Sequence, residues 1–121
     1  MDFALSEEQS AIYEMAHAFG QERIAPYARD WEQTGTIPKD LWPDLAALGF
    51  GGLYVSEASG GAGLTRLDAT LVFEALSASC ASAAAFLSIH NMVARMIDAY
   101  GSDEMKGRVL LKAITMETLL S

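Results

Sequence analysis

The sequence is short of cysteine and of basic residues. Its 121 residues include 1 cysteine, which excludes an internal disulfide and any metal site built from several cysteines. Cys80 lies in a run of small residues, where we expect a buried, inert thiol and a reducing compartment. The 8 basic residues are outnumbered by 16 acidic ones, and the net charge of −8 opposes attraction to nucleic acid or to anionic membranes. DNA and RNA are therefore not expected partners.

Long apolar runs and targeting signals are also missing. The most apolar stretch is interrupted by His90, Arg95 and Asp98, so it falls short of the roughly 18 uncharged residues that a membrane span needs. The first residues lack the basic stretch and apolar core of a signal peptide and the Arg and Ser richness of a transit peptide. We therefore expect a cytoplasmic, bacterial protein with no membrane span.

The common motifs of catalysis and cofactor binding are absent as well. The six glycines between Gly49 and Gly63 form neither a G-x-G-x-x-G motif between a strand and a helix nor a G-K-[ST] motif. His17 and His90 fall on different predicted helices without an H-E-x-x-H pattern, and no G-x-S-x-G elbow occurs. The sequence itself therefore predicts no catalytic residue, no metal ligand and no cofactor-binding residue in this chain.

What the sequence does contain is helical patterning throughout, at a length that suits one domain with a real core. Ser6 with Gln9 forms a capping box that predicts a helix over 7–20, and Thr65 with Asp68 predicts another to about Cys80. Shorter helices are predicted around Trp31, from Leu41 to Leu48, and after Ser102; Pro43 is tolerable in a first turn. The expected fold is an all-α bundle of about six helices with one glycine-rich loop.

The segment 83–100 is the most informative of these predicted helices. Apolar residues occupy nearly every side of it, so we expect the whole helix to be buried at the centre of the bundle. Its polar residues His90, Asn91, Arg95 and Asp98 must then meet partners or a ligand, because an unpaired buried polar group costs about 1 to 3 kcal/mol. A lone histidine on an apolar helix is more often a satisfied core residue than a catalyst, and both interpretations of His90 stay open.

Several short motifs follow one another along the chain. They are Leu5-Ser-Glu-Glu-Gln9, Ala25-Pro-Tyr-Ala28, Ile37-Pro38, Leu48-Gly-Phe-Gly51, Gly60-Gly-Ala-Gly-Leu64 and Tyr100-Gly-Ser-Asp-Glu-Met-Lys106. In this order they resemble the N-terminal helical domain of acyl-CoA dehydrogenases. A second group, Leu87-Ser-Ile-His-Asn-Met92, Met96-Ile-Asp98 and Thr115-Met-Glu117, is similar to the isobutyryl-CoA dehydrogenase branch of that family, which acts in valine breakdown. Leu111 departs from the pattern, because many relatives have proline there.

The resemblance implies that 1–121 is the first of three domains, without the middle β-barrel and the C-terminal helical domain that carries the catalytic glutamate. It implies FAD as the cofactor, bound mostly outside these residues, with an acyl-CoA substrate such as isobutyryl-CoA. Electron-transfer flavoprotein is the implied partner, and a tetramer is the implied assembly of the full-length enzyme. This fragment alone would be inactive. Its implied role is to form part of the acyl-chain pocket wall, with substrate contacts from the central helix at Phe86, Ile89, His90, Asn91 and Ala94.

Two alternatives remain open from the sequence. The absence of catalytic motifs also fits a stand-alone helical module that assembles with partners. The same fold also serves flavin-dependent oxidases and monooxygenases, which would keep the architecture and change the reaction.

Overall fold

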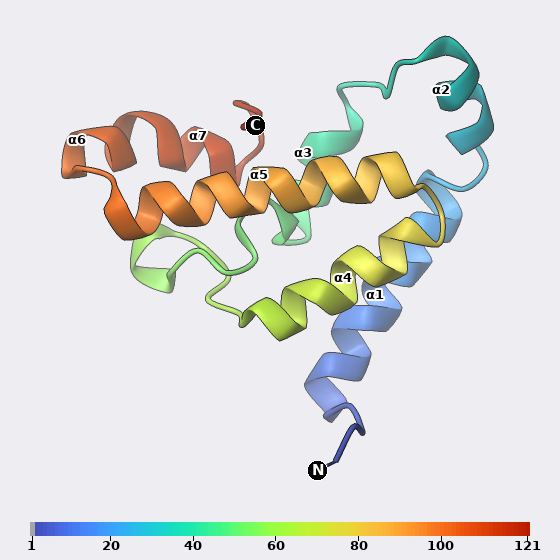
Figure 1. Ribbon diagram of the computed structural model, residues 1–121, viewed down its shortest axis with the longest axis horizontal. Helices are drawn as coiled ribbons and strands as arrows, with labels where there is room; N and C mark the ends of the chain where they lie inside the picture. The colour runs from blue at the N-terminus through green and yellow to red at the C-terminus, as the bar shows by residue number, and fades with distance from the viewer. Residues whose placement is uncertain (1) are drawn as a thin grey trace.

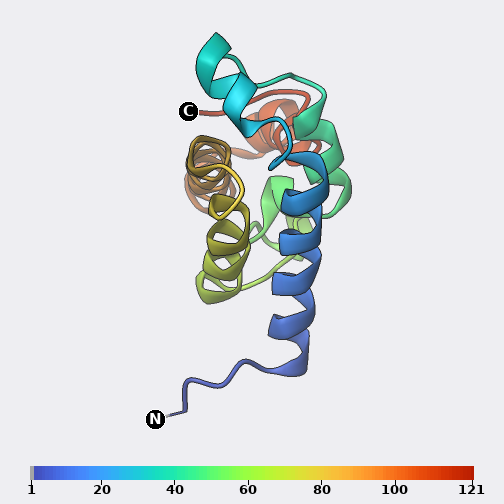
Figure 2. The ribbon, with the colours of Figure 1, turned by 90° about the vertical axis from the view of Figure 1, so that its right-hand side faces the viewer.

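The computed structural model describes residues 2–121, and its frame consists of three long helices. They are α1 (Glu7–Arg23), α4 (Arg66–Ser77) and α5 (Ala81–Tyr100). Helix α1 packs along α4, and α4 joins α5 through a tight turn from which the two helices diverge (Figure 1). The view down α5 shows α1 and α4 side by side, with the N-terminal residues leading away from the bundle (Figure 2).

Shorter elements close the rest of the fold. They are α2 (Ala28–Thr34), α3 (Leu41–Ala47), the 3₁₀ turns η1 (Phe50–Gly52) and η2 (Glu57–Ser59), α6 (Asp103–Met105), the π-helical η3 (Lys106–Leu110) and α7 (Leu111–Ile114). Since α6, η3 and α7 form one continuous helical run, the expectation of about six helices is confirmed. No strand occurs within residues 2–121, so the all-α fold class is confirmed too.

The helix starts follow the capping signals in the sequence. The Ser6 hydroxyl accepts from the Gln9 amide at 3.1 Å, and the Thr65 hydroxyl accepts from the Asp68 amide at the same distance. The side chains of Gln9 and Asp68 return the bond to the cap amides, which completes both capping boxes. Helix α1 continues three residues past its expected end at Gly20. This glycine serves close packing against the α4–α5 junction, where an added Cβ would lie 2.6 Å from Ser79 Oγ.

The main core lies between α1, α3, η1, α4 and the first half of α5. It is built from apolar side chains that have almost no exposed surface, among them Ile24, Leu45, Phe50, Leu53, Val72, Leu76 and Leu87. Cys80 sits at the edge of this core and is only partly buried, so the expectation of a buried thiol is wrong. The α4–α5 junction reaches the surface there, which leaves the thiol half covered.

Helix α5 is not buried on every side, contrary to the expectation from its apolar composition. Ile89, Met92, Met96 and Tyr100 are 45%, 49%, 54% and 88% exposed, whereas His90, Asn91 and Asp98 are 0%, 0% and 7% exposed. The helix therefore turns these three polar residues inward and much of its apolar surface outward, while the Arg95 side chain stays 39% exposed. The physical reason is that loop backbone packs against this face and needs polar partners, which apolar side chains cannot supply.

Candidate functional site

The inward face of α5 carries three buried polar side chains, and each one holds a different segment of the chain. No buried side-chain nitrogen or oxygen within residues 2–121 lacks a hydrogen-bond partner. The polar face is therefore fully satisfied within the protein, as native interiors require. The three residues are His90, Asn91 and Asp98.

Asn91 fixes the turn at the start of the glycine-rich loop. Its Oδ1 accepts from the Leu53 amide at 2.7 Å, and its Nδ2 donates to the Phe50 carbonyl at 2.9 Å. A third bond joins Nδ2 to the Leu87 carbonyl one turn back along α5 at 3.0 Å. The amide side chain thus replaces the hydrogen bonds that this irregular stretch of backbone cannot make with itself.

Asp98 fixes the next turn of the same loop. Its Oδ2 accepts from the Ser56 amide at 2.9 Å, while its Oδ1 accepts from the hydroxyls of Ser56 and Ser59. Burial raises the pKa of Asp98, but the hydrogen bonds from Ser59 and Ser56 outweigh it and hold the pKa below its ordinary value. Sequence reasoning missed these two serines, although their spacing of three residues inside the loop was a signal for a capped turn.

His90 holds the C-terminal segment. Its Nδ1 accepts from the Leu120 amide at 3.1 Å, so Nε2 carries the proton and donates to the Ala113 carbonyl at 2.8 Å. Burial lowers the pKa of His90 and outweighs the opposing effect of hydrogen bonds to the backbone of Ala113 and Gly51. The neutral ring satisfies both backbone groups, whereas the charged ring would place a second N–H against the Leu120 amide.

The glycine-rich loop is closed by its own backbone. The amides of Gly61, Ala62, Gly63 and Leu64 donate to carbonyls of Ser56, Gly52, Val55 and Leu53 respectively, at 2.8 to 2.9 Å. With these amides already bonded, the loop does not present the free donors that cradle a phosphate group. Its glycines serve close packing instead: an added Cβ at Gly61 would lie 2.3 Å from the Val55 carbonyl oxygen.

The five residues predicted to contact substrate all lie on α5, but they face different ways. His90, Asn91 and Ala94 have no exposed surface, and the first two are engaged as described above. Phe86 is partly buried and packs against Trp42, with ring centroids 4.6 Å apart. Ile89 is 45% exposed and is the one among them that presents a large surface to solvent.

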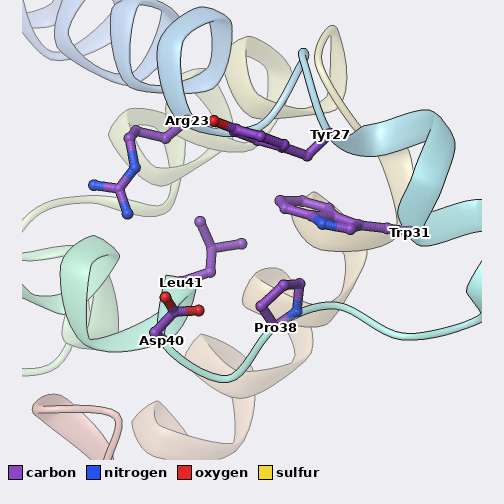
Figure 3. A pocket seen from close by; sticks show the side chains of 6 residues that line it. All are labelled: Arg23, Tyr27, Trp31, Pro38, Asp40 and Leu41. Atoms are coloured by element: carbon purple, nitrogen blue, oxygen red, sulfur yellow. The ribbon is translucent and has the colours of Figure 1, made fainter.

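A separate hollow lies where the end of α1 meets the start of α3. It has a volume of about 260 Å³ and is bordered by the stacked rings of Tyr27 and Trp31, whose centroids are 6.2 Å apart (Figure 3). Arg23 and Asp40 lie at its other side (Figure 3). The Arg23 guanidinium is paired with Asp44. The opposing charges balance across the hollow, and no nucleophile or acid–base pair is assembled there.

Two other kinds of site are absent from the described residues. Within 2–121, no group of three or more His, Cys, Asp or Glu side chains converges in the way that holding a metal ion requires. No helix in the described part of the chain has the length and apolar character needed to cross a membrane.

Comparisons with known proteins agree with this architecture. Residues 6–117 match the family described as "Acyl-CoA dehydrogenase, N-terminal domain". Mitochondrial isobutyryl-CoA dehydrogenases of Dictyostelium discoideum and Bos taurus are each 44% identical over 117 residues, which is 97% of this chain and 28% of each relative. The chain thus spans little more than a quarter of their length.

Solved structures share the fold closely. Butyryl-CoA dehydrogenase from Megasphaera elsdenii superimposes with a TM-score of 0.88 at 30% identity, covering 98% of this chain and 32% of that one. The FAD complex of PigA superimposes with the same TM-score of 0.88 at 31% identity, with the same coverage. The helical frame, the order of its motifs and these similarities together show that the chain belongs to the acyl-CoA dehydrogenase family, as its N-terminal domain.

Proposed function

We propose that this chain is the N-terminal part of an FAD-dependent acyl-CoA dehydrogenase that acts on isobutyryl-CoA or a similar short branched acyl-CoA. The observation that carries the proposal is the 44% identity to two isobutyryl-CoA dehydrogenases over nearly the whole chain. Such an enzyme removes the α-hydrogen of its substrate as a proton and the β-hydrogen as a hydride. Its place in metabolism would be valine breakdown.

Residues 1–121 form one domain of this proposed enzyme, and a middle β-barrel and a C-terminal helical domain would complete it. The buried side-chain nitrogens and oxygens of residues 2–121 all have hydrogen-bond partners within the domain, which supports a scaffolding role. We therefore infer that the 121 residues alone are inactive.

The wall of the acyl-chain pocket is the contribution we propose for α5. Ile89 would supply exposed apolar surface to this wall. Phe86, whose ring packs against Trp42, would support the wall from the core side. His90 and Asn91 lie behind this surface and fix its position through the segments that they hold, and Ala94 is buried beside them. Bulk on this wall favours a short branched acyl group, since a methylene that does not fit costs about 1 to 3 kcal/mol.

FAD would supply the redox chemistry of the proposed enzyme. The described residues do not form a site for it by themselves, because the amides of the glycine-rich loop bond to the loop itself. The flavin contacts therefore belong mostly to the other domains. Electron-transfer flavoprotein as electron acceptor and a homotetramer as the assembly are part of the same proposal and rest on family membership.

We also propose that the protein is cytoplasmic and bacterial. The two isobutyryl-CoA dehydrogenases are named as mitochondrial proteins, and they give a bacterial origin no support.

The deciding experiment begins with the intact mass of the polypeptide from its native source. A mass severalfold above the 13.0 kDa of these residues is expected. That protein should then show a flavin absorbance spectrum and reduce an electron acceptor when isobutyryl-CoA is added. A full chain without flavin, or one inert toward isobutyryl-CoA and its straight-chain isomer, would refute the proposal.

The same preparation distinguishes the proposed dehydrogenase from two alternatives. A mass of 13.0 kDa would favour a helical module that acts through partners, as the full occupancy of its buried polar groups permits. Peroxide or hydroxylated product under oxygen would favour a flavin-dependent oxidase or monooxygenase of the same fold. Formation of an enoyl-CoA without peroxide is the result expected for a dehydrogenase.

A further inference from the structure

The hollow between the end of α1 and the start of α3 has a charged half and an apolar half (Figure 3). We call it the α1–α3 hollow. Arg23 and Asp40 provide its two charges, and its apolar half is lined by Tyr27, Trp31, Pro38 and Leu41. Its volume of about 260 Å³ equals that of about nine water molecules in the liquid. A ligand with about nine non-hydrogen atoms therefore fits inside it.

The positive group of the hollow is held in place from outside. The Arg23 guanidinium is paired with Asp44 on α3, and it lies 5.5 Å from the centre of the Phe19 ring on α1. Among the described residues it donates a hydrogen bond to Asp44 alone, so most of its N–H donors stay available. A guanidinium that is fixed in this way can bind a carboxylate without first losing its own freedom.

The negative group of the hollow has no partner within residues 2–121. Asp40 precedes the first turn of α3, is exposed, and makes no side-chain hydrogen bond to that turn and no ion pair. Its carboxylate lies on the same side of the hollow as the Arg23 guanidinium (Figure 3). An unpaired carboxylate suits an ammonium group. Together the two side chains match a small ligand that carries one charge of each sign.

The apolar half of the hollow is a preformed surface. The rings of Tyr27 and Trp31 lie one helical turn apart, with their planes only 18° from parallel. Leu41 is 3% exposed, so the core holds it in position, whereas Tyr27 is 51% exposed and keeps much of its ring uncovered. Aromatic rings offer large contact areas at little cost in conformational entropy. This half therefore suits an aliphatic side chain of the ligand.

We propose that the α1–α3 hollow binds an apolar α-amino acid of about the size of leucine in its zwitterionic form. The ligand carboxylate accepts from Arg23, its ammonium group donates to Asp40, and its side chain packs against Trp31 and Leu41. This site goes beyond the proposed dehydrogenase function, because it uses none of the residues assigned to the acyl-pocket wall. It is measured as binding and not as turnover, so its failure and the failure of the proposed function are distinguishable.

The test is a calorimetric titration of the natural full-length chain with L-leucine and two neutralised analogues of similar size. Leucinamide lacks the carboxylate charge, and α-hydroxyisocaproate has a hydroxyl in place of the ammonium group. Saturable leucine binding with a dissociation constant of about 1 mM is expected, since small ligands gain little free energy per atom. Both analogues should bind at least about tenfold more weakly. Absence of saturable leucine binding, or equally tight binding of either analogue, would overturn the proposal.

Variants locate the site. Asp40→Asn removes one charge from an exposed side chain without changing its shape, so the fold should be kept, as a circular dichroism spectrum would check. It should weaken leucine binding by about tenfold, yet it should not weaken α-hydroxyisocaproate, which has no ammonium group to lose a partner. Asp103→Asn, at an exposed aspartate in α6 outside the hollow, is the matched control and should leave the leucine affinity unchanged.

A second variant tests the apolar half. Trp31→Leu removes one of the two stacked rings and should also weaken leucine binding, by about tenfold. Unchanged leucine affinity in both Asp40→Asn and Trp31→Leu would place the amino acid elsewhere and reject the assignment. An equal loss in Asp40→Asn and in the Asp103→Asn control would reject it too, because the effect would then follow net charge and not the hollow.

Discussion

His90 makes the stability of this protein depend on pH. Its folded pKa lies below the ordinary value of 6.5, because burial disfavours the charged ring. The unfolded chain then binds more protons than the folded one between these two values, so stability falls as the pH drops below 6.5. This ring should contribute a slope of up to about 1.4 kcal/mol per pH unit in that window.

Urea unfolding between pH 5 and pH 8 measures this slope. A His90→Gln variant should lose the slope, whatever its absolute stability. His17 is exposed on α1, so His17→Gln should retain the slope and serves as the matched control. A slope that survives in His90→Gln and vanishes in His17→Gln would contradict the assignment.

Asn91 should be among the most sensitive positions of the chain. Replacement by alanine removes the partners of the Leu53 amide and the Phe50 carbonyl, both in the buried turn that starts the loop. We expect Asn91→Ala to lower the free energy of unfolding by about 2 to 4 kcal/mol, measured by urea titration. Gln33→Ala removes an exposed amide from α2 and should change it by less than about 0.5 kcal/mol.

At the residue scale, the sequence predicted that polar side chains on 83–100 need partners, and it did not predict which partners. His90 finds its partners 23 and 30 residues further along the chain, at Ala113 and Leu120. Asn91 and Asp98 reach back 38 to 42 residues, to Leu53 and Ser56. These pairs depend on how the loops fold back onto α5, which no local pattern in the sequence encodes.

Among the elements, the contact between η1 and α7 leaves the least room. An added Cβ at Gly51 would lie 2.1 Å from the Ile114 carbonyl oxygen, which is a backbone atom and cannot rotate away. Gly51→Ala should therefore push α7 off η1 and cost about 1 to 3 kcal/mol, measured by thermal or urea unfolding.

Gly107 offers the matched control for that substitution. It lies in η3, and an added Cβ there would meet no atom within 4 Å. Gly107→Ala should be neutral or stabilising by about 0.5 to 1 kcal/mol, because alanine loses less backbone entropy in a helical segment. Equal destabilisation by both variants would show that packing at η1 is not the cause.

Element starts were predictable because capping depends on residues that are close in sequence. Ser6 and Thr65 marked the first residues of α1 and α4 correctly, and Pro43 does lie in the first turn of α3. The ends of the helices were less predictable. Helix α1 runs three residues past Gly20, and α4 stops at Ser77 rather than near Cys80. The expectation that α5 is buried on every side was also wrong, because apolar periodicity cannot show that loop backbone packs against one side of a helix.

On the scale of the whole molecule, the excess of acidic over basic residues controls self-association. The net charge of −8 keeps copies apart at neutral pH, and the sequence isoelectric point is about 4.5. Exposed apolar residues along α5 would then favour association once the charge is neutralised. Light scattering should be strongest near pH 4.5, where solubility is lowest, and weak at pH 8. Scattering that rises steadily from pH 4.5 to pH 8 would contradict this balance of effects.

The family and the all-α fold could be anticipated from the order of short motifs along the chain. The fold they imply is the observed one, with the glycine-rich loop between α3 and α4. The exposed and the buried residues of α5 could not be separated in the same way, because both kinds alternate along the helix every few positions. Only the direction of each side chain distinguishes exposed Ile89 from buried His90.

The bonds from Asn91 and Asp98 to Leu53 and Ser56 also determine how slowly those two loop amides can exchange their protons with solvent. Loop amides ordinarily exchange fast, yet these two are held by side chains of the longest helix and open only when that contact opens. In deuterium exchange they should therefore behave as members of α5, with protection factors that rise and fall together with those of its middle turns. A loop with the slow exchange of a helix is the signature of this polar inward face.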